Sequence, residues 1–216
     1  MKKKAISLDQ IKAFKFIKEL ETELNLPKKF FICLLRNDDW SFIIKIHTLI
    51  DVAITKAVIE TLGKPEIEDS IERLNLNTKL GFAKKLNLLE KDSLLFVQKL
   101  SEMRNQFAHN ISDVGVEILE FLNSSKKEKR DGFLKAFRWG NTKAEEIIVK
   151  EEDRTLQNLL KILAFNFADE LPKIAIWTGS LLVLRETHHK ITMSKFEKEK
   201  IEIDHKMSEL INTLLG

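Results

Sequence analysis

Apolar residues recur at helical spacing along most of the chain. In residues 8–24 they fall three or four positions apart, at Leu8, Ile11, Phe14, Ile17, Leu20 and Leu24. This spacing places them on one face of an α-helix, which Pro27 should end. A second helix should begin near Asp38 or Asp39, which are good N-caps, and stop at Gly63. Because it is apolar almost all round, we expect this second helix to be central and buried.

Further helices follow a connecting segment at residues 64–77. A short helix is predicted over residues 78–88. Asp92 should cap a longer helix that runs to residue 109, with a buried stripe made by Phe96, Leu100, Met103 and Phe107. The charged segment at residues 124–132, SSKKEKRDG, has the composition of a loop.

The last third of the chain is predicted to be helical as well. Residues 155–168 and 174–184 are strongly apolar, and Pro172 between them should start the second helix or kink the first. Residues 145–149 are compatible with a short strand. A heptad-like seam follows, with spacings of seven, four, three and four, at Phe196, Ile203, Met207, Leu210 and Leu214. This seam is suited to packing on the body of the protein or on a second copy.

The composition supports an all-α fold. Only 7 Gly and 3 Pro punctuate 216 residues, whereas an all-β sandwich needs many tight turns. We expect a compact helical bundle with an additional C-terminal helical segment, in one domain. Residues 1–123 form its core, and residues 124–216 pack on that core or on a second copy.

Charge and cysteine content narrow the function. Residues 1–110 carry 19 basic and 15 acidic side chains, and residues 111–216 carry 17 and 18, which is too balanced for the broad basic face of a duplex-DNA binder. A local phosphate site stays open. Cys33 is the only cysteine, which excludes an internal disulfide and a zinc site built on cysteines. The longest apolar stretch, at residues 174–184, is about half of what a bilayer needs, and the basic start of the chain has no apolar core behind it. We therefore expect a cytoplasmic protein without a membrane association.

The chemically richest segment is R-N-Q-F-A-H at residues 104–109. On a helix, Asn105 and His109 lie about 40° apart on the polar face, and Arg104 lies at the boundary with the buried face. Asp51, on a narrow polar stripe of the buried helix, is the expected ion partner of Arg104, with His47 to one side. Asp51 and His47 fit either a site or a satisfied polar pair.

The R-N-x-x-A-H pattern resembles the motif of the HEPN superfamily, R-x(4–6)-H with a polar residue after the Arg. The preceding segment at residues 79–89 looks like the short helix before that motif. The order of buried helix, short helix and motif is similar to the mannitol operon repressor family, a branch of this fold. The resemblance covers roughly residues 38–120, with a vaguer match near 155–185. The terminal heptad seam departs from the family pattern.

This resemblance implies metal-independent RNA cleavage without a cofactor, in which a ribose 2′-hydroxyl attacks the adjacent phosphate. His109 would act as the general acid or base. Arg104 would stabilise the charge on the phosphorane oxygens. Asn105 would orient the phosphate or fix the His109 tautomer. Such enzymes pair two motifs across a homodimer, and an antitoxin partner would fit a toxin or defence role.

Geometry and composition leave other interpretations open. Arg104 and His109 are about 140° apart around an ideal helix and about 7.5 Å apart along it, so they converge only if Arg104 curls round, if the helix ends near His109, or if a second copy faces the first. The alternative function is a non-catalytic regulator that acts through protein–protein interaction; no helix-turn-helix with a basic recognition helix is visible. In that case the motif is a solvated helix end.

Two further groups have a functional and a structural interpretation. Four basic residues in the 124–132 segment, followed by aromatic residues, are suited to RNA binding or to a solvated loop before a core helix; they are Lys126, Lys127, Lys129 and Arg130. Three histidines, His188, His189 and His205, lack the spacing of a metal site and fit a solvated surface.

Overall fold

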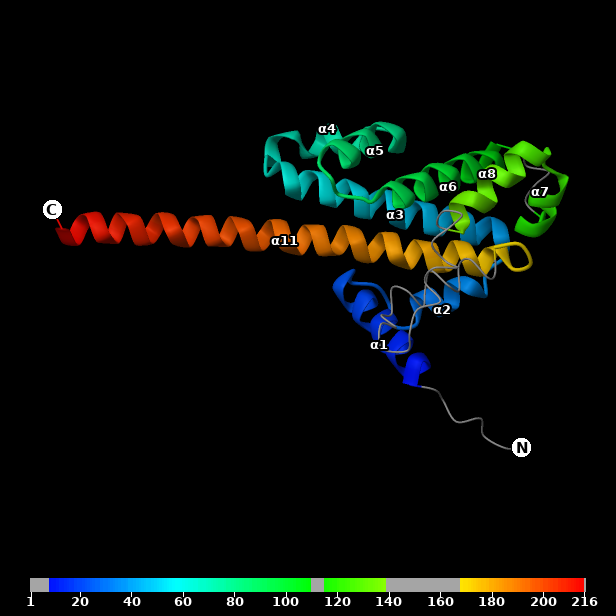
Figure 1. Cartoon of the computed structure of the whole chain (residues 1–216), viewed down its shortest axis with the longest axis horizontal. Coiled ribbons are helices and arrows are strands. Elements are labelled where there is room, and N and C mark those ends of the chain that lie inside the picture. The colour runs from blue at the N-terminus through cyan, green and yellow to red at the C-terminus, as the bar shows by residue number, and fades with distance from the viewer. Residues whose placement is uncertain (1–7, 110–114, 139–167, 216) are drawn as a thin grey trace.

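The computed structural model describes residues 8–109, 115–138 and 168–215, and within these ranges every regular element is a helix. The predicted all-α class is therefore confirmed (Figure 1). The elements are α1 (Leu8–Glu23), α2 (Phe30–Leu35), α3 (Asp39–Leu62), η1 (Pro65–Ile67), α4 (Glu68–Glu72), α5 (Leu76–Lys85), α6 (Lys91–His109), α7 (Ile118–Ser124), α8 (Lys127–Phe137) and α11 (Pro172–Leu215). None of the helices in these ranges combines the length and the apolar character that a membrane span requires.

Helix α3 forms the centre of the protein, as its apolar sequence predicts. The Asp38 carboxylate caps it by accepting the Ser41 N–H at 2.8 Å. Gly63 ends it with a φ of 64°, a left-handed conformation that glycine adopts without strain. The buried side chains between these caps point in several directions around the helix; they include Phe42, Ile43, Ile46, Ile50, Ile54, Ala57 and Val58.

The first part of helix α11 runs parallel to α3 over the length of α3 (Figure 1). Lys173, near the start of α11, pairs with Asp39 at 2.8 Å, and Lys198 pairs with Glu60 at 2.7 Å near the end of α3. These two ion pairs fix the relative position of the two helices at both ends of the contact.

Helix α6 completes the core by packing against α3, α8 and α11. Gly179 of α11 allows the close approach of α6, because a Cβ atom at this position would lie 2.5 Å from Cε2 of Phe96. The Phe96 ring in turn meets Phe137 of α8 edge-on, with centroids 5.8 Å apart.

Two features differ from the sequence prediction. The segment at residues 124–132 is mostly helical, since α8 begins at Lys127; the loop prediction was wrong because Lys, Glu and Arg are good helix formers. The short helices α2 and α4 were not predicted, because each is too short to show a period. The strand predicted at 145–149, and the helix predicted at 155–168 except Ala168, lie outside the described residues.

Candidate functional site

The R-N-x-x-A-H motif occupies the last part of α6. The buried stripe of this helix is the predicted one, and its members Phe96, Leu100, Met103 and Phe107 are fully buried. As expected from the helical period, Asn105 is exposed and Arg104 is half-buried. His109 is the last helical residue, and its side chain lies outside the described part of the chain.

The C-terminal end of α6 is fixed by a contact with α3. The Trp40 indole Nε1 donates a hydrogen bond to the Phe107 carbonyl oxygen at 2.9 Å. Carbonyls in the last turn of a helix have no partner within the helix, and this contact supplies one. The Phe107 ring also packs edge-on against Phe121 of α7, with centroids 5.2 Å apart. The backbone that carries the motif is therefore held on two sides.

Arg104 and His47 come together between α6 and α3. Arg104 donates from Nη1 to the Asn105 Oδ1 at 3.2 Å, and its buried Nε has no hydrogen-bond partner. His47 is 9% exposed, and its Nε2 is also buried without a partner. Buried polar atoms are paired in most native structures. These two nitrogens are therefore unpaired polar atoms inside the contact between α3 and α6, and both are closed to solvent.

The electrostatic environment keeps His47 neutral. The pKa of His47 is lowered to about 4: burial is the largest cause, the positive charge of Arg104 acts in the same direction, and the negative charge of Asp51 opposes both. At neutral pH the site therefore contains one cation, Arg104, beside an uncharged imidazole. This arrangement suits an anionic ligand better than a cationic one.

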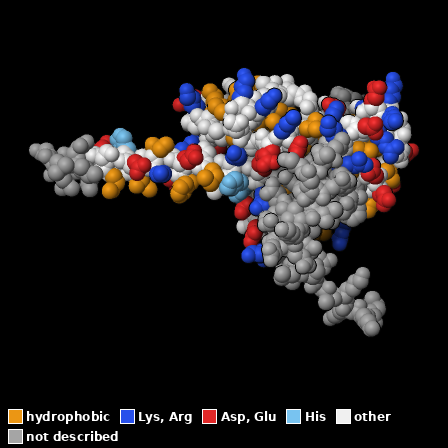
Figure 2. All heavy atoms as spheres, in the orientation of Figure 1, with side chains coloured by type: hydrophobic (Ala, Val, Ile, Leu, Met, Phe, Trp, Pro, Cys, Tyr) orange, Lys and Arg blue, Asp and Glu red, His pale blue; other side chains and the backbone are white. Residues whose placement is uncertain are grey.

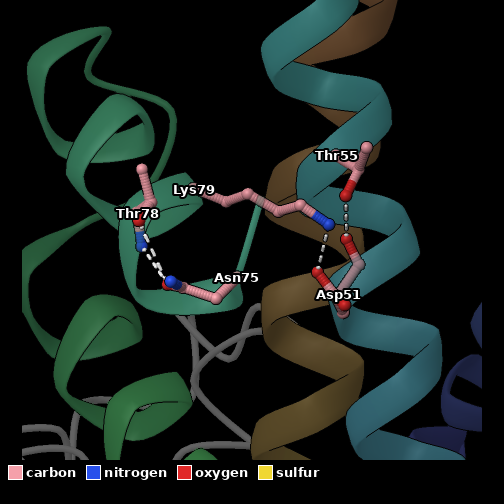
Figure 3. Close-up of polar contacts among 5 residues, drawn as sticks. All are labelled: Asp51, Thr55, Asn75, Thr78 and Lys79. Carbon is pink, nitrogen blue, oxygen red and sulfur yellow. Dashed lines mark hydrogen bonds and ion pairs between the residues drawn. The ribbon is translucent and has the colours of Figure 1, made fainter. Parts of the chain in front are cut away.

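Asp51 does not pair with Arg104, contrary to the expectation from the sequence. Its Oδ1 accepts from Lys79 Nζ at 2.9 Å (Figure 3). The Lys79 side chain is only 5% exposed, whereas that of Asp51 is 33% exposed. The pairing follows from the packing of α5 on α3, which Asn75 supports by capping α5 with a 2.9 Å bond from Thr78 N–H.

The position of Lys79 in the sequence indicates a buried ion pair that was not predicted. Lys79 lies on the buried stripe of α5, between Leu76, Leu80 and Ala83. A lysine at such a position needs a buried partner of opposite charge. The only carboxylate on the polar stripe of the buried helix is that of Asp51.

The low pKa of His47 predicts a pH-dependent stability. The unfolded chain binds a proton at His47 near pH 6.5, and the folded chain binds it only near pH 4. Because the unfolded chain takes up this proton first, the free energy of unfolding falls as the pH drops from about 6.5 to about 4. The expected loss is roughly 2–4 kcal/mol, and above pH 6.5 none of it occurs. Urea unfolding of the wild type and of His47→Gln over this range should show a steeper loss in the wild type. Equal slopes would contradict the prediction.

Two of the four predicted RNA-binding residues line a cavity of about 760 Å³. Lys127 and Arg130 lie there with Lys135 and Arg138 of α8, and Arg138 pairs with Asp169. Lys129 instead lies over the Phe121 ring, 5.7 Å from its centroid. Lys126 is the N-cap residue of α8. Because Phe121 also touches Phe107, α7 connects this basic surface to the end of α6.

The three histidines of α11 do not form a metal site. His188 Nδ1 lies 3.2 Å from Glu23 of α1, and His205 lies 3.5 Å from Glu209 with its side chain 73% exposed. His189 is exposed. Among the residues that the structure describes, no three His, Cys, Asp or Glu side chains gather in a way that would hold a metal ion.

Comparisons with known proteins do not place the chain in a family. No protein-family model matches the chain, and no curated protein or solved structure shows a significant match. The resemblance to the HEPN superfamily therefore stays a prediction that rests on the motif residues and their setting.

Proposed function

We propose that this protein is a metal-independent endoribonuclease of HEPN type, acting in the cytoplasm as a toxin or in defence. The observation that carries the proposal is the setting of the R-N-x-x-A-H motif at the end of α6. There Arg104 lies beside the neutral His47, and each has a buried nitrogen without a partner. Arg104 is half-buried, and a phosphate group at its exposed side would supply the negative charge and the acceptor oxygens that a guanidinium binds.

Each motif residue has a role in the proposed reaction. The ribose 2′-hydroxyl attacks the adjacent phosphorus, the bond to the 5′-oxygen breaks, and a cyclic phosphate and a 5′-hydroxyl are left. His109 transfers the proton, since an imidazole titrates near neutral pH. Arg104 stabilises the charge on the phosphorane oxygens. Asn105 accepts a hydrogen bond from Arg104, which supports a role in orienting the guanidinium.

The proposal places the site within one chain. On a continuous helix Arg104 and His109 lie about 140° apart and do not share a face. The two residues would converge in one chain if Arg104 curls round the helix or if the helix ends near His109, which is the last residue of α6 that the structure describes. The basic cavity beside α7 and α8 would then hold neighbouring phosphates through Lys127 and Arg130.

The proposal is tested by incubating the purified chain with end-labelled single-stranded RNA in EDTA. We expect cleavage of RNA but not of DNA of the same sequence. We also expect that a single 2′-deoxy nucleotide on the 5′ side of a cleaved bond protects that bond alone, because it removes the nucleophile. RNA that stays intact across varied sequences, or cleavage at the deoxy position, would contradict the proposal.

A non-catalytic regulator that acts through protein contacts is the second candidate. The observation that favours it is the exposure of large apolar side chains on α11, among them Phe196, Ile203 and Met207. This candidate predicts a stoichiometric protein partner whose binding is unchanged by His109→Ala. An antitoxin would differ from such a partner. It would bind this chain and protect RNA from cleavage, so its discovery would be compatible with the proposed ribonuclease activity.

A further inference from the structure

The C-terminal part of α11 projects from the body as a helical arm (Figure 1). Towards the C-terminus, Ser194 and Lys198 contact the body through Glu60 of α3. We use the term arm for residues 189–215. Four large apolar side chains on it are 43–63% exposed: Met193, Phe196, Ile203 and Met207.

Of the five large apolar side chains that are exposed on the described part of the arm, four lie on one face, which points away from the body; the fifth, Ile201, lies on another face. Phe196 is about 160° around the helix from both Ser194 and Lys198, which contact α3. Figure 2 shows hydrophobic side chains along the edge of the arm that faces away from α3 and α5. In the sequence, Leu210 and Leu214 continue the same spacing. Positions 193, 196, 200, 203, 207, 210 and 214 thus form a heptad seam whose one polar member is Lys200.

We propose that two copies of this chain pair through this seam, with their arms antiparallel. An apolar stripe of this length on a projecting helix is a protein-binding surface. The charged residues beside the seam favour a second copy of this chain as the binding partner. If Phe196 faces Met207 of the partner subunit, Glu199 lies beside Lys206 of the partner subunit, and the pair occurs twice by symmetry. The stem of Lys200 then crosses the seam towards Asp204 of the partner subunit.

The same charges oppose a parallel pair of arms. In a parallel coiled coil, Lys200 would meet Lys200 of the partner subunit in the seam. Glu199 would lie beside Asp204 of the partner subunit, again twice. Both arrangements place like charges together and are destabilising. The antiparallel pairing adds two Glu199–Lys206 pairs and avoids the meeting of Lys200 with Lys200 of the partner subunit, and these outweigh the one kind of like-charge contact that it contains, Glu197 beside Asp204 of the partner subunit.

The length of the arm fits the antiparallel arrangement. With Phe196 opposite Met207 of the partner subunit, residue 215 of each chain falls opposite residue 188 of the other. His188 is where Glu23 of α1 contacts α11, so the overlap ends where the body covers the helix again. The overlap of residues 189–215 is roughly 40 Å long.

This dimer is independent of the proposed ribonuclease activity. The end of α6 contacts Trp40 near the start of α3, and the start of α3 is also where Lys173 begins the contact of α11. The motif therefore lies at the end of the body away from the arm. Paired arms leave the two motifs far apart, unlike the motif-to-motif homodimer that the family resemblance implies. Loss of either property leaves the other intact.

The dimer is tested by measuring the mass of the full chain by analytical ultracentrifugation. We expect a dimer at micromolar concentration, and Ile203→Lys should weaken it by roughly 100-fold or more, since a lysine would enter the seam in both copies. Ile201→Lys is the matched control: Ile201 is 68% exposed but lies about 160° around the helix from Ile203. A monomeric wild type at about 100 μM, or equal effects of the two variants, would overturn the proposal.

Charge reversal tests the direction of the arms. In the antiparallel arrangement Glu199→Lys and Lys206→Glu should each weaken the dimer by roughly tenfold, and the double variant should restore it. In a parallel arrangement Glu199→Lys would relieve the repulsion by Asp204 and tighten the dimer, and that result would overturn the antiparallel proposal. Thermal unfolding of the body should be the same in all variants, because these residues do not contact it.

Discussion

Replacing His109 with alanine should reduce the rate of RNA cleavage by roughly 10²–10⁴-fold. In the proposed reaction this imidazole moves the proton, and no other histidine belongs to the motif. The fold should persist, because alanine is a good helix former. Circular dichroism and a gel-based cleavage assay on the same preparation would separate the two effects.

The matched control for this substitution is His205→Ala. His205 is a histidine on the arm whose side chain is 73% exposed and lies 3.5 Å from Glu209. We expect this variant to cleave RNA at the wild-type rate. If His109→Ala cleaves as fast as His205→Ala, the motif does not carry the activity.

Asp51→Ala should lower the free energy of unfolding by about 3 kcal/mol. The substitution leaves the ammonium group of Lys79 without its partner in a position where the side chain is only 5% exposed. A buried charge without a partner is costly, although water reaches this pair from the Asp51 side, which is 33% exposed. Urea unfolding, followed by circular dichroism, measures the change.

The double variant Asp51→Ala/Lys79→Met provides the control. Methionine fills most of the space of the lysine stem and carries no charge, so the double variant should recover most of the lost stability. A single Asp51→Ala variant within about 0.5 kcal/mol of the wild type would show that the ion pair does not stabilise the packing of α5 on α3.

The parts of the fold that follow from local sequence were predictable. The spacing of apolar residues predicted α1 and α3. The residue types at the ends of α3 predicted its N-cap near Asp38 and its end at Gly63. The stripe from Phe96 to Phe107 gave the orientation of α6, including the half-buried position of Arg104. Each of these features depends on residues within one helix.

The parts that depend on contacts between helices were not predictable. Asp51 pairs with Lys79 because α5 packs against α3, and a single helical wheel does not contain that information. The same holds for His47, whose low pKa results from burial and from Arg104 of another helix. For the arm, the heptad spacing predicted the seam, but its projection beyond the body depends on where α3 ends.

The central claim is that Arg104 and His109 catalyse cleavage of RNA by its own 2′-hydroxyl. The most direct test is the chemistry of the fragment ends that the wild type and Arg104→Ala produce in EDTA, determined by mass spectrometry. The account predicts 2′,3′-cyclic phosphate and 5′-hydroxyl ends from the wild type, and their loss in Arg104→Ala. Fragments with 5′-phosphate ends, or the same cyclic ends at an undiminished rate from Arg104→Ala, would contradict it.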